Sequence, residues 1–337
     1  MKRREFSALL GGGLLSATAF GGTAARAFSP PSNKVVPITV GALATGTAQW
    51  ELSVIKENEL DKKHGVDLTL KDVSGKQASH VALMSGDVDI VLSDFIWVAG
   101  VRADGEDFTV IPHSYAVGGL MVQPDGPIQS IDDLPGKTIA IAGGPVDKSW
   151  VALRAYYKKM KGEDLVDLVD ARFGAPPLVN ELLAEGKADA ALNFWHFNAR
   201  SKAAGMKELI SVTEMMDGLG VTEQPPLLGW VFRESVAAEK PEAIKGFLDA
   251  SFEAKKMLKS RDTVWNGLRG MMRAEDDDAL FTTLRDDYRK GIVTEYTPAL
   301  IDAAAESYAI MAEVGGPELV GEATEMPEGT FWSGYSV

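Results

Sequence analysis

The chain has 337 residues, a formal net charge of −14 at pH 7 and no cysteine. The absence of cysteine excludes disulfides, thiolate catalysis and cysteine-ligated zinc or iron–sulfur centres. The acidic balance disfavours nucleic acid as a partner, because phosphate backbones carry the same sign of charge.

The N-terminal residues have the features of an export signal. Arg3 and Arg4 precede a short apolar run over residues 7–22, and an A-x-A cleavage motif ends at Ala27. The run is shorter than the roughly 20 apolar residues that a membrane-spanning helix needs, which disfavours a membrane anchor. We therefore expect residues 1–27 to be a twin-arginine (Tat) signal peptide, recognised by the Tat machinery and removed on export to the periplasm.

The part of the chain that follows contains an internal repeat with an offset of 100 residues. Residues 66–94 align with residues 166–194 without a gap, and seven of the 29 paired positions are identical. Trp50 falls on Trp150 at the same offset. A period of this length is too long for a solenoid. It predicts two similar lobes, and two lobes imply a cleft between them.

Strands and helices alternate in both copies. The first copy contains predicted strands over residues 35–41, 66–73 and 88–93, with helices over residues 50–63 and 77–85. The second copy contains predicted strands over residues 138–142, 168–173 and 188–193, with helices over residues 150–161 and 178–184. Short apolar strands separated by helices favour parallel sheets with right-handed crossovers.

The chain beyond the second copy returns to a strand and then becomes helical. After Pro225 and Pro226, the sequence predicts a strand over residues 228–232, then helices near residues 241–260, 263–274 and 279–290. The charged remainder after Gly315, which contains Gly and Pro, is expected to form a loosely packed tail.

Polar and aromatic side chains gather where the predicted strands end, and ligands of open parallel sheets bind beyond those ends. The candidate ligand-binding residues of the first copy are Thr47, Gln49, Trp50, Lys76, Ser93, Asp94 and Trp97. Tyr115, near an expected crossover, joins them, and the second copy adds Asp147, Ser149, Trp150, Asn193, Trp195 and His196. Tryptophan is scarce in general, so its concentration here predicts a cleft lined by aromatic rings. For any single ring, packing within or between the lobes is an equal alternative.

Three sequence motifs resemble those of the periplasmic solute-binding proteins of ABC importers. They are LMSGDVDIVLSD (83–94), SIDDLPGKTIAIAGGP (130–145) and LLAEGKADAALNFW (182–195). The resemblance runs from about Val36 to Met311 and is to the branch that carries nitrate, taurine, alkanesulfonates and thiamine-precursor pyrimidines. It implies an α/β fold of the type II kind, with two Rossmann-like lobes, mixed and mostly parallel sheets, and two crossovers. It also implies that the lobes close on solute like a hinged trap.

The resemblance further implies where the lobes begin and end. One lobe comprises residues 33–117 with 228–310, the other comprises residues 118–227, and residues 311–337 form a C-terminal tail. The partners it implies are a small-molecule solute and an ABC permease of the inner membrane, with the receptor itself a monomer. The binding groups that it implies are Thr47, Gln49, Ser93, Asp94, the GGPVDKS turn and Asn193.

One departure from the family affects the expected ligand. No arginine stands at these strand ends to hold a sulfonate or nitrate, which leaves Lys76, Lys148, His196 and helix N-termini as anion partners. Asp94, Asp147 and Glu51 repel an anion. We therefore expect a planar heterocycle or an amine-bearing solute, and a zwitterion such as taurine remains possible.

The sequence disfavours an enzyme. The GKT at residues 136–138 lacks the upstream glycine of a P-loop, since Ile131 occupies that position, and it precedes a strand. No G-x-S-x-G or H-E-x-x-H motif occurs, and the four histidines lack metal-ligand spacing. We expect no catalytic residue, no cofactor and no metal. Gly86 and Gly186 are expected to end helices before turns into the next strands. The alternative is an exported enzyme of the same fold that acts on a pyrimidine or pyridoxal-like compound.

Overall fold

The computed structural model describes residues 35–44, 46–221 and 223–336. The predicted Tat signal, residues 1–27, lies outside this range. Among the described residues, no helix combines the length and the apolar character that crossing a membrane requires.

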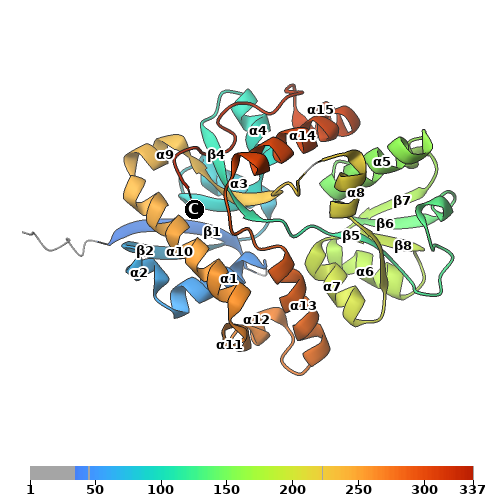
Figure 1. The fold of residues 1–337 in the computed structure, drawn as a ribbon, viewed down its shortest axis with the longest axis horizontal. Helices are drawn as coiled ribbons and strands as arrows, with labels where there is room; N and C mark the ends of the chain where they lie inside the picture. Colours follow the sequence, from blue (N-terminus) through green and yellow to red (C-terminus); the bar gives the residue numbers. More distant parts are fainter. Residues whose placement is uncertain (1–34, 45, 222, 337) are drawn as a thin grey trace, which may run out of the picture. The chain divides into compact units, whose positions relative to one another are not determined.

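The first lobe is built on a five-stranded sheet with the order β2-β1-β3-β10-β4 (Figure 1). Its strands are β1 (Val36–Leu43), β2 (Val66–Val73), β3 (Ile90–Asp94), β4 (Phe108–Ser114) and β10 (Leu228–Arg233). β1 is parallel to β2 and β3, whereas β10 is antiparallel to β3 and β4. The helices packed on it are α1 (Ala48–Glu57), α2 (Leu60–Lys63), α3 (Lys76–Met84), α4 (Phe95–Ala103), α9 (Glu234–Glu239) and α10 (Pro241–Ser260).

The second lobe repeats this sheet, with the order β7-β6-β8-β5-β9. Its strands are β5 (Gly119–Val122), β6 (Thr138–Ala142), β7 (Asp170–Gly174), β8 (Ala190–Asn193) and β9 (Lys207–Ser211). Its helices are α5 (Lys148–Lys161), α6 (Pro176–Ala184), α7 (Trp195–Ala203) and α8 (Val212–Leu219), with 3-10 turns η1 (Ile131–Asp133) and η2 (Leu165–Asp167). The chain crosses between the sheets after β4 and again before β10. The predicted α/β class with two lobes and mixed sheets is thereby confirmed.

The offset of 100 residues is visible in the structure. α1 and α5 begin at residues 48 and 148, α3 and α6 at residues 76 and 176, and α4 and α7 at residues 95 and 195. Gly86 and Gly186 follow α3 and α6 with φ angles of 75° and 67°, a conformation that glycine adopts without strain. Both glycines therefore end their helices as expected.

Two predicted helices are each divided in the structure. The segment predicted as one helix over residues 50–63 forms α1 and α2, because Glu59 adopts the left-handed conformation with φ 51°. The segment 263–274 forms α11 (Asp262–Asn266) and α12 (Arg269–Met272), and α13 (Asp278–Lys290) follows.

The C-terminal residues are packed, so the expectation of a loose tail is wrong. α14 (Pro298–Gly315) extends into this segment, and α15 (Pro317–Val320) lies within it. Phe331 then forms a parallel bridge with Val110 of β4, and the Thr109 hydroxyl donates to the Gly329 carbonyl at 2.8 Å. Phe331 and Thr330 are buried. The segment covers the edge of β4, whose backbone groups would otherwise lack partners.

Apolar packing continues from one lobe to the other. Val91 and Phe95 of the first lobe belong to the same buried cluster as Trp150 and Leu192 of the second. α14 packs against α5, and α13 packs against α7. The strand ends that were predicted to bind ligand therefore lie between lobes that touch.

Candidate functional site

Two helices with acidic caps begin at the strand ends between the lobes. Asp94 ends β3 and caps α4, where its Oδ1 accepts a hydrogen bond from the Trp97 N–H at 2.9 Å. Asp147 caps α5 in the second lobe in the same way and accepts from the Ser149 N–H at 2.9 Å. A side chain that caps a helix is held in one orientation. The two carboxylates are therefore fixed groups.

Asp94 is the centre of a cluster of charges drawn from both lobes. The Lys76 Nζ, from α3 of the same lobe, lies 2.6 Å from Asp94 Oδ2. The Lys148 Nζ, from α5 of the other lobe, lies 3.4 Å from the same oxygen. The exposed fractions of the side chains are 48% for Lys76, 19% for Lys148 and 5% for Asp94. We refer to these three residues as the charged cluster.

The protonation states of the charged cluster follow from burial and from the lysines. Burial of Asp94 opposes its ionisation, but the positive charges of Lys148 and Lys76 outweigh that effect and hold its pKa well below the usual range. Burial tends to lower the pKa of Lys76, and the charge of Asp94 reverses this and raises it. For Lys148 burial prevails, and its pKa is lowered. Asp94 is therefore an anion at neutral pH, and Lys148 is the less strongly stabilised of the two cations.

A histidine that was not predicted from the sequence lies beside the charged cluster. The His80 Nε2 is 2.8 Å from the Ser93 hydroxyl, and its ring stacks on Trp97 with centroids 3.7 Å apart. Burial, and next the charge of Lys76, lower the pKa of His80 to about 4, so its imidazole is neutral at neutral pH. Its position one helical turn after Lys76 on α3 is the signal that places it on the same face.

The equivalent position in the second lobe holds an amide in place of the imidazole. Asn180, which pairs with His80 at the offset of 100, accepts a hydrogen bond from the Asn193 side chain at 2.8 Å. Asn193 also donates to the Pro176 carbonyl and accepts from the Phe194 N–H. The side chain of Asn193, a predicted ligand-binding residue, therefore makes its hydrogen bonds within the protein.

The tryptophans that open α1 and α5 are buried. Trp50 is 4% exposed and packs against Trp195, Trp265 and Tyr288 at centroid distances of 5.9, 6.1 and 5.5 Å. Trp150 is 1% exposed and lies in the core. In this structure both rings contact packed side chains, which corresponds to the alternative of packing within or between the lobes, and a role of either ring in binding ligand stays a prediction. Trp195 is half-buried and contacts Trp50 across the lobes.

The other predicted residues are dispersed. Thr47 precedes α1 without a capping hydrogen bond from its side chain, and Gln49 donates to the Leu43 carbonyl at 3.2 Å. Burial, followed by the charges of Glu223 and Glu295, raises the pKa of Tyr115 to about 12. Burial, followed by the charge of Arg200, lowers the pKa of His196 to about 4, so its imidazole is neutral at neutral pH, and its buried Nδ1 has no hydrogen-bond partner among the described residues. The structure therefore gathers only a subset of the predicted residues, namely Lys76, Ser93, Asp94, Trp97, Asp147 and Ser149.

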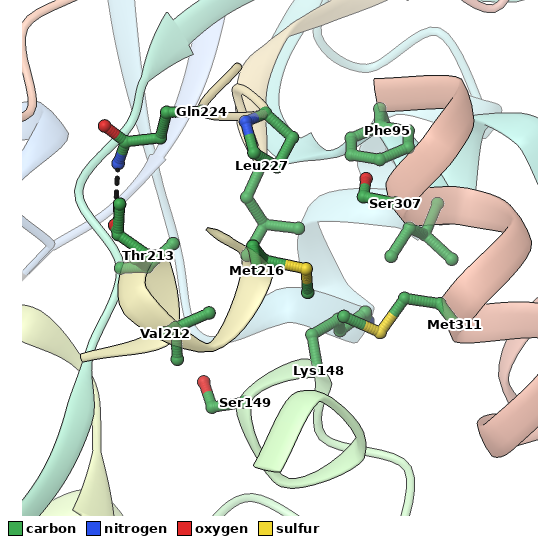
Figure 2. Close-up of a pocket in the computed structure, with 13 residues that line it drawn as sticks. Phe95, Lys148, Ser149, Val212, Thr213, Met216, Gln224, Leu227, Ser307 and Met311 are labelled. Atoms are coloured by element: carbon green, nitrogen blue, oxygen red, sulfur yellow. Dashed lines mark hydrogen bonds between the residues drawn. The ribbon is translucent and has the colours of Figure 1, made fainter. Parts of the chain in front are cut away.

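Lys148 of the charged cluster also lines a small cavity (Figure 2). Its free volume is about 20 Å³, which suffices for little more than one water molecule. Lys148 and Ser149 of α5, Phe95 of α4, Met216 of α8 and Met311 of α14 contribute to its lining. The cavity therefore touches both lobes, and its mostly apolar lining also includes the polar residues Lys148, Ser149, Thr213, Gln224 and Ser307.

The described residues offer no metal centre. Across residues 35–44, 46–221 and 223–336, no group of three or more His, Asp or Glu side chains is placed to hold a metal ion.

Two similar α/β lobes, joined by two crossovers and with charged groups where their strands end, define the type II periplasmic binding protein class. The chain matches the NMT1/THI5-like family model over residues 56–261, and it belongs to that family. The resemblance inferred from its motifs is confirmed at this level. No curated protein matches the chain significantly.

Several solved structures share the fold. The periplasmic aliphatic sulphonate binding protein SsuA from Escherichia coli is 16% identical, with a TM-score of 0.70 over 89% of this chain and 93% of that chain. The alkanesulfonate-binding protein SsuA from Xanthomonas axonopodis pv. citri, bound to MOPS, is 15% identical, with a TM-score of 0.66 over 89% of this chain and 99% of that chain. An ABC transporter structure from Parabacteroides distasonis is 14% identical, with a TM-score of 0.65 over 88% and 98% of the two chains. At these identities the similarity establishes the fold alone.

Proposed function

We propose that this protein is the periplasmic receptor of an ABC importer and that it holds a small charged organic solute at the charged cluster between its lobes. The observation that carries the proposal is the position of Asp94 Oδ2, which faces Lys76 of its own lobe and Lys148 of the other. A solute bound at this point contacts both lobes, so that binding is coupled to their closure. The closed form then delivers the solute to the permease.

The internal repeat supplies a control for this assignment. The positions that correspond to the charged cluster in the other copy are occupied by the uncharged residues Pro176, Phe194 and Ala48. The helices at those positions nevertheless begin at equivalent residues. Folding of the repeat therefore does not require these charges, and removing charges from water is costly. Their presence at the boundary between lobes supports a role in binding.

The size of the cavity supports a mechanism that involves movement. A volume of about 20 Å³ does not admit an organic solute, so the lobes must separate before one enters. The two crossovers are the covalent links about which such a movement takes place. Lys148 then leaves Asp94 as the lobes part, while Lys76 stays with it.

The charges favour a solute that carries charge itself. Trp97 is stacked on His80 and Trp195 packs against Trp50, so the rings near the site contact one another. This supports an amine-bearing or zwitterionic solute more strongly than a stacked planar heterocycle. The relatives named as aliphatic sulphonate and alkanesulfonate receptors support an acid group on that solute.

The proposal is tested by removing the ammonium group of Lys148. Native mass spectrometry of freshly purified protein identifies any solute that copurifies, and calorimetry measures its affinity. We expect Lys148→Met to weaken binding by about tenfold or more, because a charge-assisted contact is lost. Lys158→Met, on the exposed side of α5, is the matched control and should bind as the wild type does. Equal affinity of both variants, or a protein that binds no organic solute, would refute the proposal.

We also propose that the chain reaches the periplasm by the Tat route. The twin arginines at positions 3 and 4 support this proposal. Replacing both by lysine should leave unprocessed precursor in the cytoplasm, detected by fractionation and blotting. Normal processing of that variant would contradict the route.

A further inference from the structure

The charged cluster contains a carboxylate, that of Asp94, at the point where Lys76 and Lys148 would otherwise bind an anion. We propose that Asp94 is the specificity-determining residue of the site, and that it selects solutes carrying both an ammonium group and an acid group over plain anions. This inference rests on the proposed function and narrows its solute class.

Asp94 is a fixed counter-ion for the two lysines. Its Oδ1 accepts the Trp97 N–H at 2.9 Å and thereby caps α4. Its Oδ2 faces both ammonium groups, at 2.6 and 3.4 Å. Since rotating the carboxylate away from the lysines breaks the cap, the negative charge stays in place when a solute arrives.

A plain anion competes with the Asp94 carboxylate for the Lys148 ammonium group. To reach Lys148 it must take the place of Asp94 at that ammonium group, while Asp94 remains close by on the other lobe. Two negative charges then lie near each other in a partly buried place, where water screens them weakly. The anion therefore binds against repulsion.

A solute with both groups avoids that repulsion. Its ammonium group takes the position beside Asp94 Oδ2 that Lys148 leaves, and its acid group pairs with Lys148. The charges then alternate from one lobe to the other, and the solute replaces the single contact between Asp94 and Lys148 with two. The ion pair between Asp94 and Lys148 is the longer of the two ion pairs at Asp94, and it joins different lobes. It is therefore the ion pair that opens when a solute binds.

Asp277 provides a matched control away from the charged cluster. It is an exposed acid that caps α13 as Asp94 caps α4, and its oxygen accepts the Leu280 N–H at 2.8 Å. Asp277 lies on a different helix from every residue of the charged cluster. Asparagine caps helices about as well as aspartate, so neither Asp94→Asn nor Asp277→Asn removes the start of its helix.

The test compares acids that differ only in an amine. Calorimetry measures the affinity of the wild type, Asp94→Asn and Asp277→Asn for taurine against ethanesulfonate, and for β-alanine against propionate. We expect the wild type to favour the amine-bearing member of at least one pair by about tenfold or more. Asp94→Asn should lose that preference and bind the plain anion more tightly than the wild type does, whereas Asp277→Asn should keep the preference. Circular dichroism and melting temperature confirm that both variants are folded.

The outcomes separate this inference from the proposed function. If the wild type binds both members of each pair equally, or if Asp94→Asn keeps the preference, the inference is wrong while the receptor function stands. If no probe binds any of the three proteins, the inference is wrong, and the receptor function is decided separately by the solute that native mass spectrometry identifies and by Lys148→Met.

Discussion

Asp89 and Asp189 occupy equivalent places in the two lobes and make the same hydrogen bond. The carboxylate of Asp89 accepts the Thr39 N–H at 2.8 Å, and that of Asp189 accepts the Thr138 N–H at 2.9 Å. In return, the N–H groups of Asp89 and Asp189 donate to the Thr39 and Thr138 carbonyls. Each aspartate thus joins the turn after a helix to the strand beside it. The duplicated G-x-x-D pattern is therefore a structural element, not an acid pair for catalysis.

This relationship predicts a cost in stability at both positions. Asp189→Ala should lower the free energy of unfolding by about 1.5–3 kcal/mol, the range for a lost hydrogen bond to a charged group. Asp89→Ala should cost at least as much, because Asp89 also pairs with Lys240 at 2.8 Å. Urea unfolding followed by circular dichroism measures both. Asp87→Ala, which removes an exposed carboxylate on the same turn, is the control, and an equal loss there would contradict the assignment.

A second prediction concerns charges buried under α1. Glu51 and Lys255 are fully buried, with Lys255 Nζ 3.3 Å from Glu51 Oε1, and the Ser251 hydroxyl donates to the same oxygen at 2.5 Å. Glu51→Ala leaves a buried ammonium group without its counter-ion, so we expect a loss of about 3–5 kcal/mol in the free energy of unfolding. Glu57→Ala, at the exposed end of the same helix, should change stability by no more than about 0.5 kcal/mol. A small effect at Glu51 would show that the interior accommodates the unpaired lysine.

The fold could be predicted well from the sequence because each strand and helix has its own local sequence pattern, and because that pattern occurs twice. Strands β2 and β6 and helix α10 have the predicted bounds, and the offset of 100 residues located both lobes. The direction in which a side chain points was not predictable in the same way. Trp50 and Trp150 stand at helix starts next to the strand ends, yet tertiary packing turns both rings into the core. The division likewise depends on a positive φ at Glu59, a residue type that rarely adopts this conformation, and the turn residue Asn58 directly before it did not suffice to predict the break.

The charged cluster was predictable only in part. Lys76 and Asp94 follow strands of the same lobe, so the rule for strand ends selects them. Lys148 was predicted only as an anion partner, because its contact with Asp94 depends on how two distant segments meet. The pairing of Phe331 with Val110 is similar, since a short apolar pair near the end of the chain does not indicate which strand it covers.

A third prediction concerns pH. Burial and the charge of Lys76 lower the pKa of His80 from its ordinary 6.5 to about 4, and the charge of Lys148 acts in the same direction while Asp94 opposes it. Between these two values the unfolded chain binds a proton that the folded protein does not, so stability falls as the pH falls from 6.5 to about 4. His80→Asn introduces the residue type that the other lobe has at the equivalent position, Asn180. It removes the contribution of the imidazole to the pH dependence of stability. The urea midpoint of the variant should therefore depend less on pH across this window than that of the wild type. An unchanged dependence would show that His80 does not contribute to the effect.

The last prediction concerns the aromatic contact between the lobes. Trp195 of α7 packs against Trp50 and Tyr288 of the first lobe, at centroid distances of 5.9 and 5.8 Å. On the same side, Arg200 donates to the Met272 carbonyl at 2.9 Å and Lys202 pairs with Asp287. These contacts hold the lobes together without any part of the charged cluster. Trp195→Ala should therefore favour the separated form, with a larger radius of gyration in X-ray scattering of the solute-free protein.

The same variant should release solute faster. An aromatic pair contributes roughly 0.5–1.5 kcal/mol beyond the area it buries, which corresponds to a dissociation rate about 2- to 10-fold higher. Phe194→Ala is the control, because that ring packs against the core of the second lobe alone and its loss leaves the lobe contact intact. The preference among solutes should be unchanged in both variants, since neither alters Asp94 or the lysines. A radius and a dissociation rate equal to those of the wild type would show that Trp195 does not hold the lobes together.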